Sequence, residues 1–247
     1  MKKQLLRIFC LAIFIGLASC QIASAQYSLG IKGGLGIPNL TAGGNNPVSS
    51  GWSSRLGPYF GLIGQYSPNN WLDLQLQLNY ASQGGKKNGE QAIPNPIGSV
   101  PPYLYANFNS EVKLNYLELP VLAKINLPLG RNWTFYVDAG PYVSYLLKAV
   151  NQNSGSSYIY LDQAETQQSP YPPTPQSFDS TLSITDQLKR FNTGIEGGIG
   201  ISWILGNGKM FFEAGGNYGF INIQKYPQDG KNNTGSATLA LGYLTNL

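Results

Sequence analysis

The 247-residue chain has no histidine, and its only two cysteines, Cys10 and Cys20, lie close to the amino terminus. Histidine is the commonest general base and the commonest protein metal ligand, so both kinds of chemistry lose their usual residue. Beyond residue 20 no cysteine is present to form a disulfide or a thiolate site. The sequence also contains no phosphate-binding loop and no metal-ligand spacing. We therefore expect no enzymatic activity, no catalytic residue, no metal and no cofactor.

Charged residues are scarce as well, at 11% of the chain, and the formal net charge is +4. Three of the 16 basic residues are Lys2, Lys3 and Arg7, so the rest of the chain has 13 basic residues against 12 acidic ones. The basic residues are not interleaved with aromatic residues along a patch, which is the pattern of nucleic-acid-binding surfaces. Nucleic acid is therefore not an expected partner.

No apolar run is long enough for a transmembrane helix, which needs about 20 residues. The clearest run, residues 8–17, follows the basic start of the chain and precedes Ala23-Ser24-Ala25. A basic start, a short apolar core and small residues after it are typical of a secretory signal peptide. We expect residues 1–25 to be cleaved and residues 26–247 to form the exported domain. The segment Leu17-Ala18-Ser19-Cys20 resembles a lipobox, so lipidation at Cys20 is the alternative.

Alternation of apolar and polar residues is the main positive signal. In residues 72–80, leucines and Tyr80 occupy every second position, while Asp73 and three amide residues lie between them. Because the side chains of a strand point alternately to opposite faces, such a segment separates an apolar from a polar environment. Comparable patterns predict strands at residues 27–37, 56–66, 72–80, 114–126, 133–148, 190–205, 209–223 and 236–247.

Short and long connections alternate between the expected strands. Residues 67–70, 128–132 and 206–208 are tight turns, whereas residues 38–55, 82–113, 149–189 and 224–235 are long polar segments. Aromatic residues recur near both ends of the expected strands, as in the girdles of membrane barrels. These features predict an all-β fold: an eight-stranded, antiparallel, up-and-down transmembrane β-barrel in the outer membrane, with both termini in the periplasm.

The polar phase of the strands indicates which face lies inside. It carries Gln, Asn and Gly but few of the Lys and Glu residues of a water-exposed wall, so we expect the apolar phase to face lipid. Five acids, two lysines and two tyrosines then point inward: Asp73, Glu118, Asp138, Glu196, Glu213, Lys32, Lys124, Tyr136 and Tyr142. Because unpaired buried charge is costly, we expect them to form a packed polar plug. A proton or ion path through the lumen is the alternative.

The segment Tyr116-Leu117-Glu118-Leu119-Pro120-Val121-Leu122-Ala123-Lys124 resembles a signature of the PorT-like outer-membrane β-barrel family. The glycine-rich segments at residues 30–34 and 194–200 resemble that family too, and the similarity extends over essentially the whole exported domain. The resemblance implies an eight-stranded barrel in the outer membrane of a Gram-negative bacterium. One branch of the family serves a secretion and gliding-motility apparatus, which implies an accessory role of that kind as one alternative.

The long connection at residues 149–189 is the expected site for a partner. Residues 150–187 contain four acids and no basic residue, although a solvated loop without a partner is the simpler interpretation. We expect a non-enzymatic integral outer-membrane barrel with interacting surface loops. Its expected partners are outer-membrane lipid, lipopolysaccharide and a protein at residues 149–189. The alternatives are an accessory part of a secretion or transport apparatus, a small-solute porin, and a lipid-anchored soluble binding barrel.

Overall fold

The computed structural model describes residues 26–43, 46–96 and 101–247. The expected signal peptide, residues 1–25, and the alternative lipidation site Cys20 lie outside the described residues. Within the described part of the chain, no helix has the length and hydropathy needed to cross a membrane.

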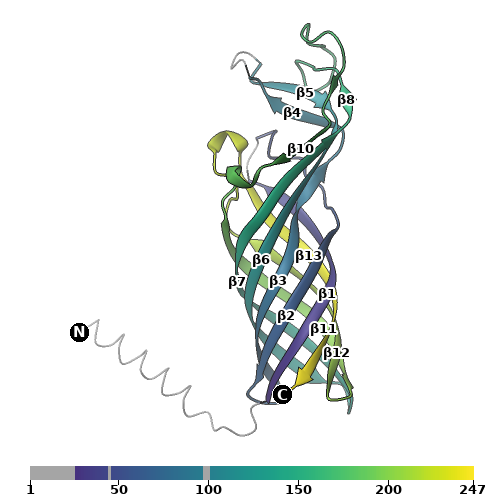
Figure 1. Cartoon of the computed structure of the whole chain (residues 1–247), viewed down its shortest axis with the longest axis vertical. Helices are drawn as coiled ribbons and strands as arrows, with labels where there is room; N and C mark the ends of the chain where they lie inside the picture. The colour runs from purple at the N-terminus through teal and green to yellow at the C-terminus, as the bar shows by residue number, and fades with distance from the viewer. Residues whose placement is uncertain (1–25, 44–45, 97–100) are drawn as a thin grey trace, which may run out of the picture.

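Eight long strands form one closed antiparallel ring (Figure 1). They are β1 (Gln26–Ala42), β2 (Gly57–Ser67), β3 (Leu72–Lys87), β6 (Asn109–Pro128), β7 (Trp133–Ser154), β11 (Phe191–Leu205), β12 (Gly208–Gly219) and β13 (Asn232–Asn246). Each long strand pairs with the long strands that precede and follow it in the sequence, and β1 pairs with β13 to close the ring. The predicted eight-stranded up-and-down barrel is confirmed.

Shorter elements lie in the long connections between these strands. They are the strands β4 (Glu90–Pro94), β5 (Tyr103–Asn107), β8 (Ser156–Ser157), β9 (Gln176–Ser177) and β10 (Ser180–Ser183), and the 3-10 helices η1 (Thr185–Gln187) and η2 (Pro227–Asp229). In Figure 1, β4, β5 and β8 stand above the barrel.

The two ends of the barrel differ in their connections. At one end, the short-turn end, residues 68–71, 129–132 and 206–207 join consecutive strands. The chain also ends here, and the Leu247 amide donates a hydrogen bond to the Tyr27 carbonyl at 2.9 Å. At the other end, the long-loop end, lie the long connections with their short strands (Figure 1).

The outer wall of the barrel is apolar over a band of limited height. In β6 the outward residues are apolar from Leu117 to Leu127, a stretch that fits the length of a transmembrane strand, about 9–11 residues. Outward side chains of the other strands are about half exposed, as for Leu76 at 53% and Ile199 at 52%. Such a wall needs lipid around it, so the alternative of a soluble barrel with its apolar residues inside is wrong.

Aromatic pairs mark the two edges of this apolar band. Trp133 and Trp203 lie near the short-turn end, with 5.3 Å between their ring centroids. Tyr145 and Phe191 lie towards the long-loop end, with 5.1 Å between their ring centroids. Two such levels are the girdles of a membrane barrel, where aromatic rings sit at the depth of the lipid headgroups.

Several strands extend further than the sequence predicts. β6 and β7 have 20 and 22 residues, about twice the length that a membrane crossing needs. Their upper parts form a paired ribbon that reaches Asn109 and Ser154, and β3 follows them to Lys87. The sequence predicts loops for residues 82–87, 109–113 and 149–154, and this is wrong. These segments lack apolar alternation because neither of their faces meets lipid.

A β-bulge in β7 changes which side chains point inward at the long-loop end. The register between β6 and β7 shifts between Asn115, which lies opposite Lys148, and Tyr116, which lies opposite Leu146. Leu147 and Lys148 both point outward as a result, whereas Leu146 is fully buried. A bulge leaves one residue unpaired and so moves the alternation by one position.

Candidate functional site

All nine residues predicted for the lumen are buried, none of them more than 8% exposed. We call these residues the lumen cluster: Lys32, Asp73, Glu118, Lys124, Tyr136, Asp138, Tyr142, Glu196 and Glu213. Eight strands leave an interior only wide enough for side chains to fill, so groups from opposite walls can touch. Five carboxyl groups and two ammonium groups share this space.

One lysine joins two walls of the lumen. Lys32 of β1 has its Nζ 3.1 Å from Glu213 Oε1 of β12 and 4.0 Å from Glu196 Oε1 of β11. Tyr136 of β7 donates from its hydroxyl to Glu213 Oε2 at 3.1 Å. Tyr59 of β2 donates to Glu196 Oε1 at 3.2 Å. Two carboxylates are thus held by one ammonium and two phenols, which satisfies most of their acceptor atoms.

The second lysine is held differently. Lys124 of β6 lies in register between Asp73 of β3 and Asp138 of β7. Its Nζ lies over the ring of Tyr136, 3.6 Å from the centroid, and forms no ion pair within the described residues. Asp73 Oδ2 instead accepts a hydrogen bond from Asn126 Nδ2 at 2.7 Å. Lys124 is therefore placed by a cation–π contact at the centre of an acidic neighbourhood.

Amide side chains that the sequence did not single out complete the network. Glu118 accepts from Gln83 Nε2 at 3.2 Å and from Asn217 Nδ2 at 3.3 Å. Asn79 Nδ2 donates to the Tyr59 hydroxyl at 2.8 Å. Asn79, Tyr59 and Asn217 lie within predicted strands, so the alternation could have identified them, whereas Gln83 lies in a segment predicted as a loop. The alternation does not say which carboxylate each of them meets.

Large side chains fill the lumen, and glycines on the neighbouring strand make room for two of them: Gly200 and Gly194 of β11 lie opposite Tyr136 and Tyr142 of β7. A Cβ on Gly200 would collide with the ring of Tyr136, and one on Gly194 would collide with Tyr142. Two apolar clusters also enter the lumen. Ile63, Tyr136, Phe211 and Leu244 pack together towards the short-turn end. At the long-loop end the larger cluster contains Leu40, Val112, Leu114, Tyr116, Leu146, Ala149, Leu188 and Ile223. The plug that the sequence predicts is polar, whereas these apolar clusters lie on either side of it; Leu146 continues the inward phase of Tyr142 and Ser144, and the β7 bulge turns Ala149 inward as well.

The segment that resembles the PorT-like signature contributes to both faces of β6. Tyr116, Glu118 and Lys124 are buried in the lumen, and Pro120 is buried between them. Leu117 and Leu119 point outward and are 39% and 40% exposed. The polar residues of this motif therefore point into the interior of the barrel.

The outermost part of the chain is folded. We call residues 88–96, 101–108 and 155–183 the crown, which contains β4, β5, β8, β9 and β10. β4 pairs with β5, β8 with β9, and β10 with the end of β7. The two parts of the crown meet where Tyr105 and Tyr160 form a bridge and where Phe108 stacks on Phe178 with ring centroids 4.4 Å apart.

A cavity of about 280 Å³ lies between the crown and the upper apolar cluster. Leu40, Phe108 and Leu188 contribute apolar surface, and Trp52 and Lys87 stand beside them. The Lys87 Nζ donates to the Val48 carbonyl at 2.6 Å and lies 4.6 Å from the centroid of the Trp52 ring. Burial lowers the pKa of Lys87 to about 8. This cavity lies at the long-loop end of the barrel.

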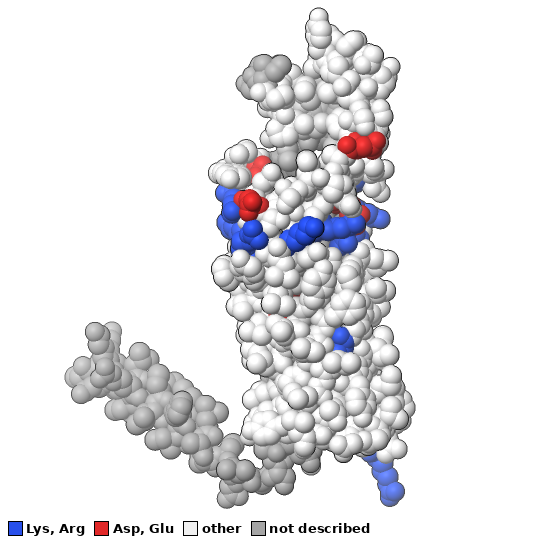
Figure 2. All heavy atoms as spheres, in the orientation of Figure 1, with Lys and Arg blue, Asp and Glu red and all other residues white. Residues whose placement is uncertain are grey.

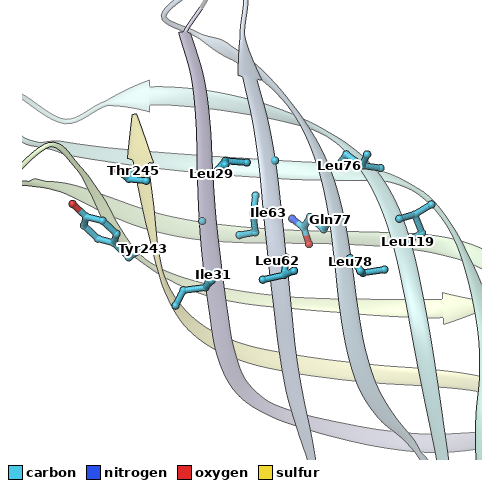
Figure 3. Close-up of a pocket in the computed structure, with 12 residues that line it drawn as sticks. Leu29, Ile31, Leu62, Ile63, Leu76, Gln77, Leu78, Leu119, Tyr243 and Thr245 are labelled. Carbon is cyan, nitrogen blue, oxygen red and sulfur yellow. The ribbon is translucent and has the colours of Figure 1, made fainter. Parts of the chain in front are cut away.

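A second hollow, of about 690 Å³, lies against the lower wall of the barrel (Figure 3). Leu29, Leu62, Leu76 and Leu119 line it, and all four belong to the outward apolar phase. The outward position of Gly64, which lacks a side chain, leaves space between them. Because this wall faces lipid, acyl chains fill the hollow, and we do not treat it as a site for a soluble ligand.

The described residues contain no cluster of three or more His, Cys, Asp or Glu side chains that could hold a metal ion. Within the lumen, Lys32 lies between Glu213 and Glu196, and Lys124 lies in register between Asp73 and Asp138.

Comparison with known proteins gives one family match and several distant structural neighbours. No curated protein sequence matches the chain. The attachment invasion locus protein Ail of Yersinia pestis is 14% identical, with a TM-score of 0.36, and 90% of this chain and 99% of Ail are covered. Neisserial surface protein A is 11% identical, with a TM-score of 0.41 and coverages of 87% and 95%. OprG of Pseudomonas aeruginosa is 11% identical, with a TM-score of 0.39 and coverages of 90% and 97%.

The family match covers most of the chain. A model described as the outer membrane protein beta-barrel domain matches residues 21–225. The barrel therefore lies in the outer membrane, with its short-turn end and both termini in the periplasm and its long-loop end at the cell exterior. The chain belongs to the outer membrane protein beta-barrel domain family.

Proposed function

We propose that this protein is a non-enzymatic outer-membrane anchor whose extracellular crown binds a protein partner. The crown is the observation that carries this proposal. Long surface loops of a barrel need no structure of their own, yet here they form three additional strand pairings and an aromatic stack. Ordering these residues costs conformational entropy, so a defined surface is more readily explained by recognition than by a mere connection.

The crown offers both strand edges and exposed apolar side chains. β4 pairs only with β5 among the described residues, and β10 pairs only with β7. Unpaired strand edges can accept a further strand from a partner, with main-chain hydrogen bonds supplying affinity. Tyr171 is 83% exposed and Leu182 of β10 is 55% exposed. These two side chains are the anchors that we propose for a partner at residues 149–189.

The filled lumen argues against a small-solute porin. An open path would have to pass the Tyr136 cluster and the upper apolar cluster in series. The chemistry of the lumen also gives no support to an enzyme, because the chain has no histidine and the glutamates Glu118, Glu196 and Glu213 are engaged by lysine, phenol and amide donors.

A more specific version of this proposal is that the partner belongs to a secretion or transport apparatus, in which this protein would have an accessory role. The PorT-like motif does not favour it, because Glu118 and Lys124 are buried in the lumen and cannot meet a partner. For such a role we expect the crown to provide the contact.

Photo-crosslinking in intact cells tests the proposed function. A crosslinking amino acid at Tyr171 should capture a discrete protein, whereas one at Leu129, which is exposed at 57% in a periplasmic turn, should not capture the same protein. Replacing residues 161–175 by a Gly/Ser linker of equal length should abolish capture from Leu182. Unchanged capture after this replacement, in a protein that still shows a boiling-dependent gel shift, would contradict a partner site on the crown.

A further inference from the structure

Basic side chains gather at one level of the molecule. Nine of the 13 Lys and Arg residues after residue 25 lie at the outer rim of the barrel, below the crown. We call them the basic rim: Arg55, Lys86, Lys87, Lys113, Lys148, Lys189, Arg190, Lys225 and Lys231. Figure 2 shows Lys and Arg as a band across one face, above a barrel wall that is almost free of charge.

The basic rim begins where the apolar band ends. Lys148 directly follows Leu147, which faces outward and is 46% exposed. Arg190 directly precedes Phe191, which is 69% exposed. Because the apolar band fixes the depth of the acyl chains, the next level outward is the depth of the lipid headgroups.

Five of the nine basic residues are exposed, and four of these five form no ion pair or side-chain hydrogen bond in the described structure; the fifth, Lys225, donates from its Nζ to the Asp186 carbonyl at 2.6 Å. Lys86, Lys148, Lys189, Lys225 and Lys231 are exposed. The ion pairs found at the rim of the described structure join Arg55 and Lys113 to Glu111, and Arg190 to Asp186. None of the five exposed lysines takes part in them. Asp229 is the remaining acid at this level, so the rim has nine basic residues against three acidic ones.

The crown carries the opposite charge. Its charged residues are Glu90, Asp162, Glu165 and Asp179, and it contains no basic residue. An acidic protein that covered the rim would also approach these four carboxylates and be repelled by them. An anionic layer confined to headgroup depth would meet the lysines and leave the crown above it. The separation of charge along the barrel axis therefore favours a lipid surface over an acidic protein as the ligand.

We propose that the basic rim binds the phosphate groups of outer-leaflet glycolipids and so fixes the depth of the barrel in the membrane. The ligand class is a phosphorylated lipid headgroup, with the acyl chains packed on the apolar band below. The proposal concerns a different surface from the crown, so it does not depend on whether the crown binds a protein.

Native mass spectrometry of the detergent-purified, full-length exported protein with diphosphoryl lipid A tests this proposal. The rim variant Lys148→Gln/Lys189→Gln/Lys231→Gln removes three exposed charges whose side chains form none of the hydrogen bonds found in the described structure. We expect it to lose roughly fivefold in lipid affinity per lysine, the scale for single basic residues at an anionic membrane surface. The variant Arg131→Gln/Lys209→Gln, at the periplasmic end, is the matched control and should bind as the wild type does.

Two comparisons separate phosphate recognition from general lipid contact. Dephosphorylated lipid A should bind the wild type as weakly as diphosphoryl lipid A binds the rim variant, and added salt should weaken only the phosphate-dependent binding. All variants should keep the boiling-dependent gel shift of a folded barrel. Equal binding of the two lipids, or an equal loss in the rim and control variants, would overturn the proposal.

Discussion

Single residues in the lumen are placed by close packing rather than by charge alone. Gly200 lies against the Tyr136 ring, and a Cβ there would also approach the Phe212 carbonyl. Since Tyr136 both donates to Glu213 and lies under Lys124, moving its ring disturbs two contacts at once. The packing at this position therefore determines whether two of the charged side chains keep their partners.

We expect Gly200→Ala to lower the free energy of unfolding by about 1–3 kcal/mol, the usual cost of overpacking a filled interior. Gly64→Ala is the matched control, because a Cβ on Gly64 would meet no atom nearer than the Leu76 carbonyl at 3.7 Å. It should change stability by about 0.5 kcal/mol or less. Urea unfolding in lipid bilayers measures both values. Equal stability of the two variants would show that the lumen yields to an added methyl group.

Lys87, which lines the cavity below the crown, makes the stability of this region depend on pH with a defined sign. Its pKa is about 8 in the folded protein because of burial, and about 10.4 for a solvated lysine. Between these values the folded state holds fewer protons than the unfolded state, so the stability of the region around Lys87 should rise with pH from about 8 to about 10.4.

The titration of Lys87 can be followed by NMR of protein labelled with 13C at lysine Cε. One resonance should titrate with a midpoint near pH 8 and disappear in Lys87→Met. The rise in urea midpoint between pH 7.5 and pH 9.5 should be smaller in Lys87→Met than in the wild type. Lys86→Met removes the exposed neighbour and should leave the pH dependence unchanged. A Lys87 resonance that titrates only above pH 10 would refute this prediction.

At the scale of elements, a buried arginine ties the first long loop to β3 and β6. Arg55 Nε lies 2.8 Å from Glu111 Oε1, and its Nη1 donates to the carbonyls of Ser82 and Gln83 at 3.1 and 3.2 Å. Its side chain is only 6% exposed. Arg190 offers a comparison at the same rim, because its Nη2 lies 2.9 Å from Asp186 Oδ1, with the Arg190 side chain 34% exposed and the Asp186 side chain 95% exposed.

We expect Arg55→Gln to weaken the extended part of β3 and β6 by about 1.5–3 kcal/mol, because charged hydrogen bonds are lost and carbonyl groups stay buried. Arg190→Gln should cost at most about 1 kcal/mol, since an exposed ion pair contributes little. Hydrogen exchange of the amides at residues 82–87 and 109–113 measures the difference. Similar exchange rates in the two variants would mean that the paired ribbon, not Arg55, holds this region.

The elements that the sequence predicts well are those that have lipid on one face. The alternation in residues 72–80 predicts both the strand and which of its faces points inward, because lipid and lumen impose opposite polarity on alternate residues. Residues 149–154 extend β7 without any such contrast, so the alternation cannot reveal them. The β7 bulge after Leu146 is a further feature that the sequence does not predict. It reverses the alternation of inward and outward side chains locally, and the residue types there are those of an ordinary strand. The contacts of Glu118 with Gln83 and Asn217 depend on the stagger of the closed barrel, which a single strand does not encode.

At the scale of the whole molecule, the barrel is closed twice along its axis. The lower cluster contains Tyr136 and Phe211, and the upper cluster contains Tyr116 and Leu146. Between them lies the polar part of the lumen, with Lys32 bound to Glu213. Two closures in series mean that opening either one alone leaves no continuous path for an ion.

Planar-bilayer recordings test this arrangement. The wild type should show no steady conductance, and neither Tyr116→Ala/Leu146→Ala nor Tyr136→Ala/Phe211→Ala should conduct, because each leaves one cluster in place. Combining the four substitutions should give cation-selective conductance, since five carboxylates and two lysines would then line the path. Each variant is accepted only if it retains the boiling-dependent gel shift. A conducting wild type would restore the porin interpretation. Conductance in the Tyr116/Leu146 variant alone would show that the upper apolar cluster is the single gate and that the polar lumen beneath it already passes ions.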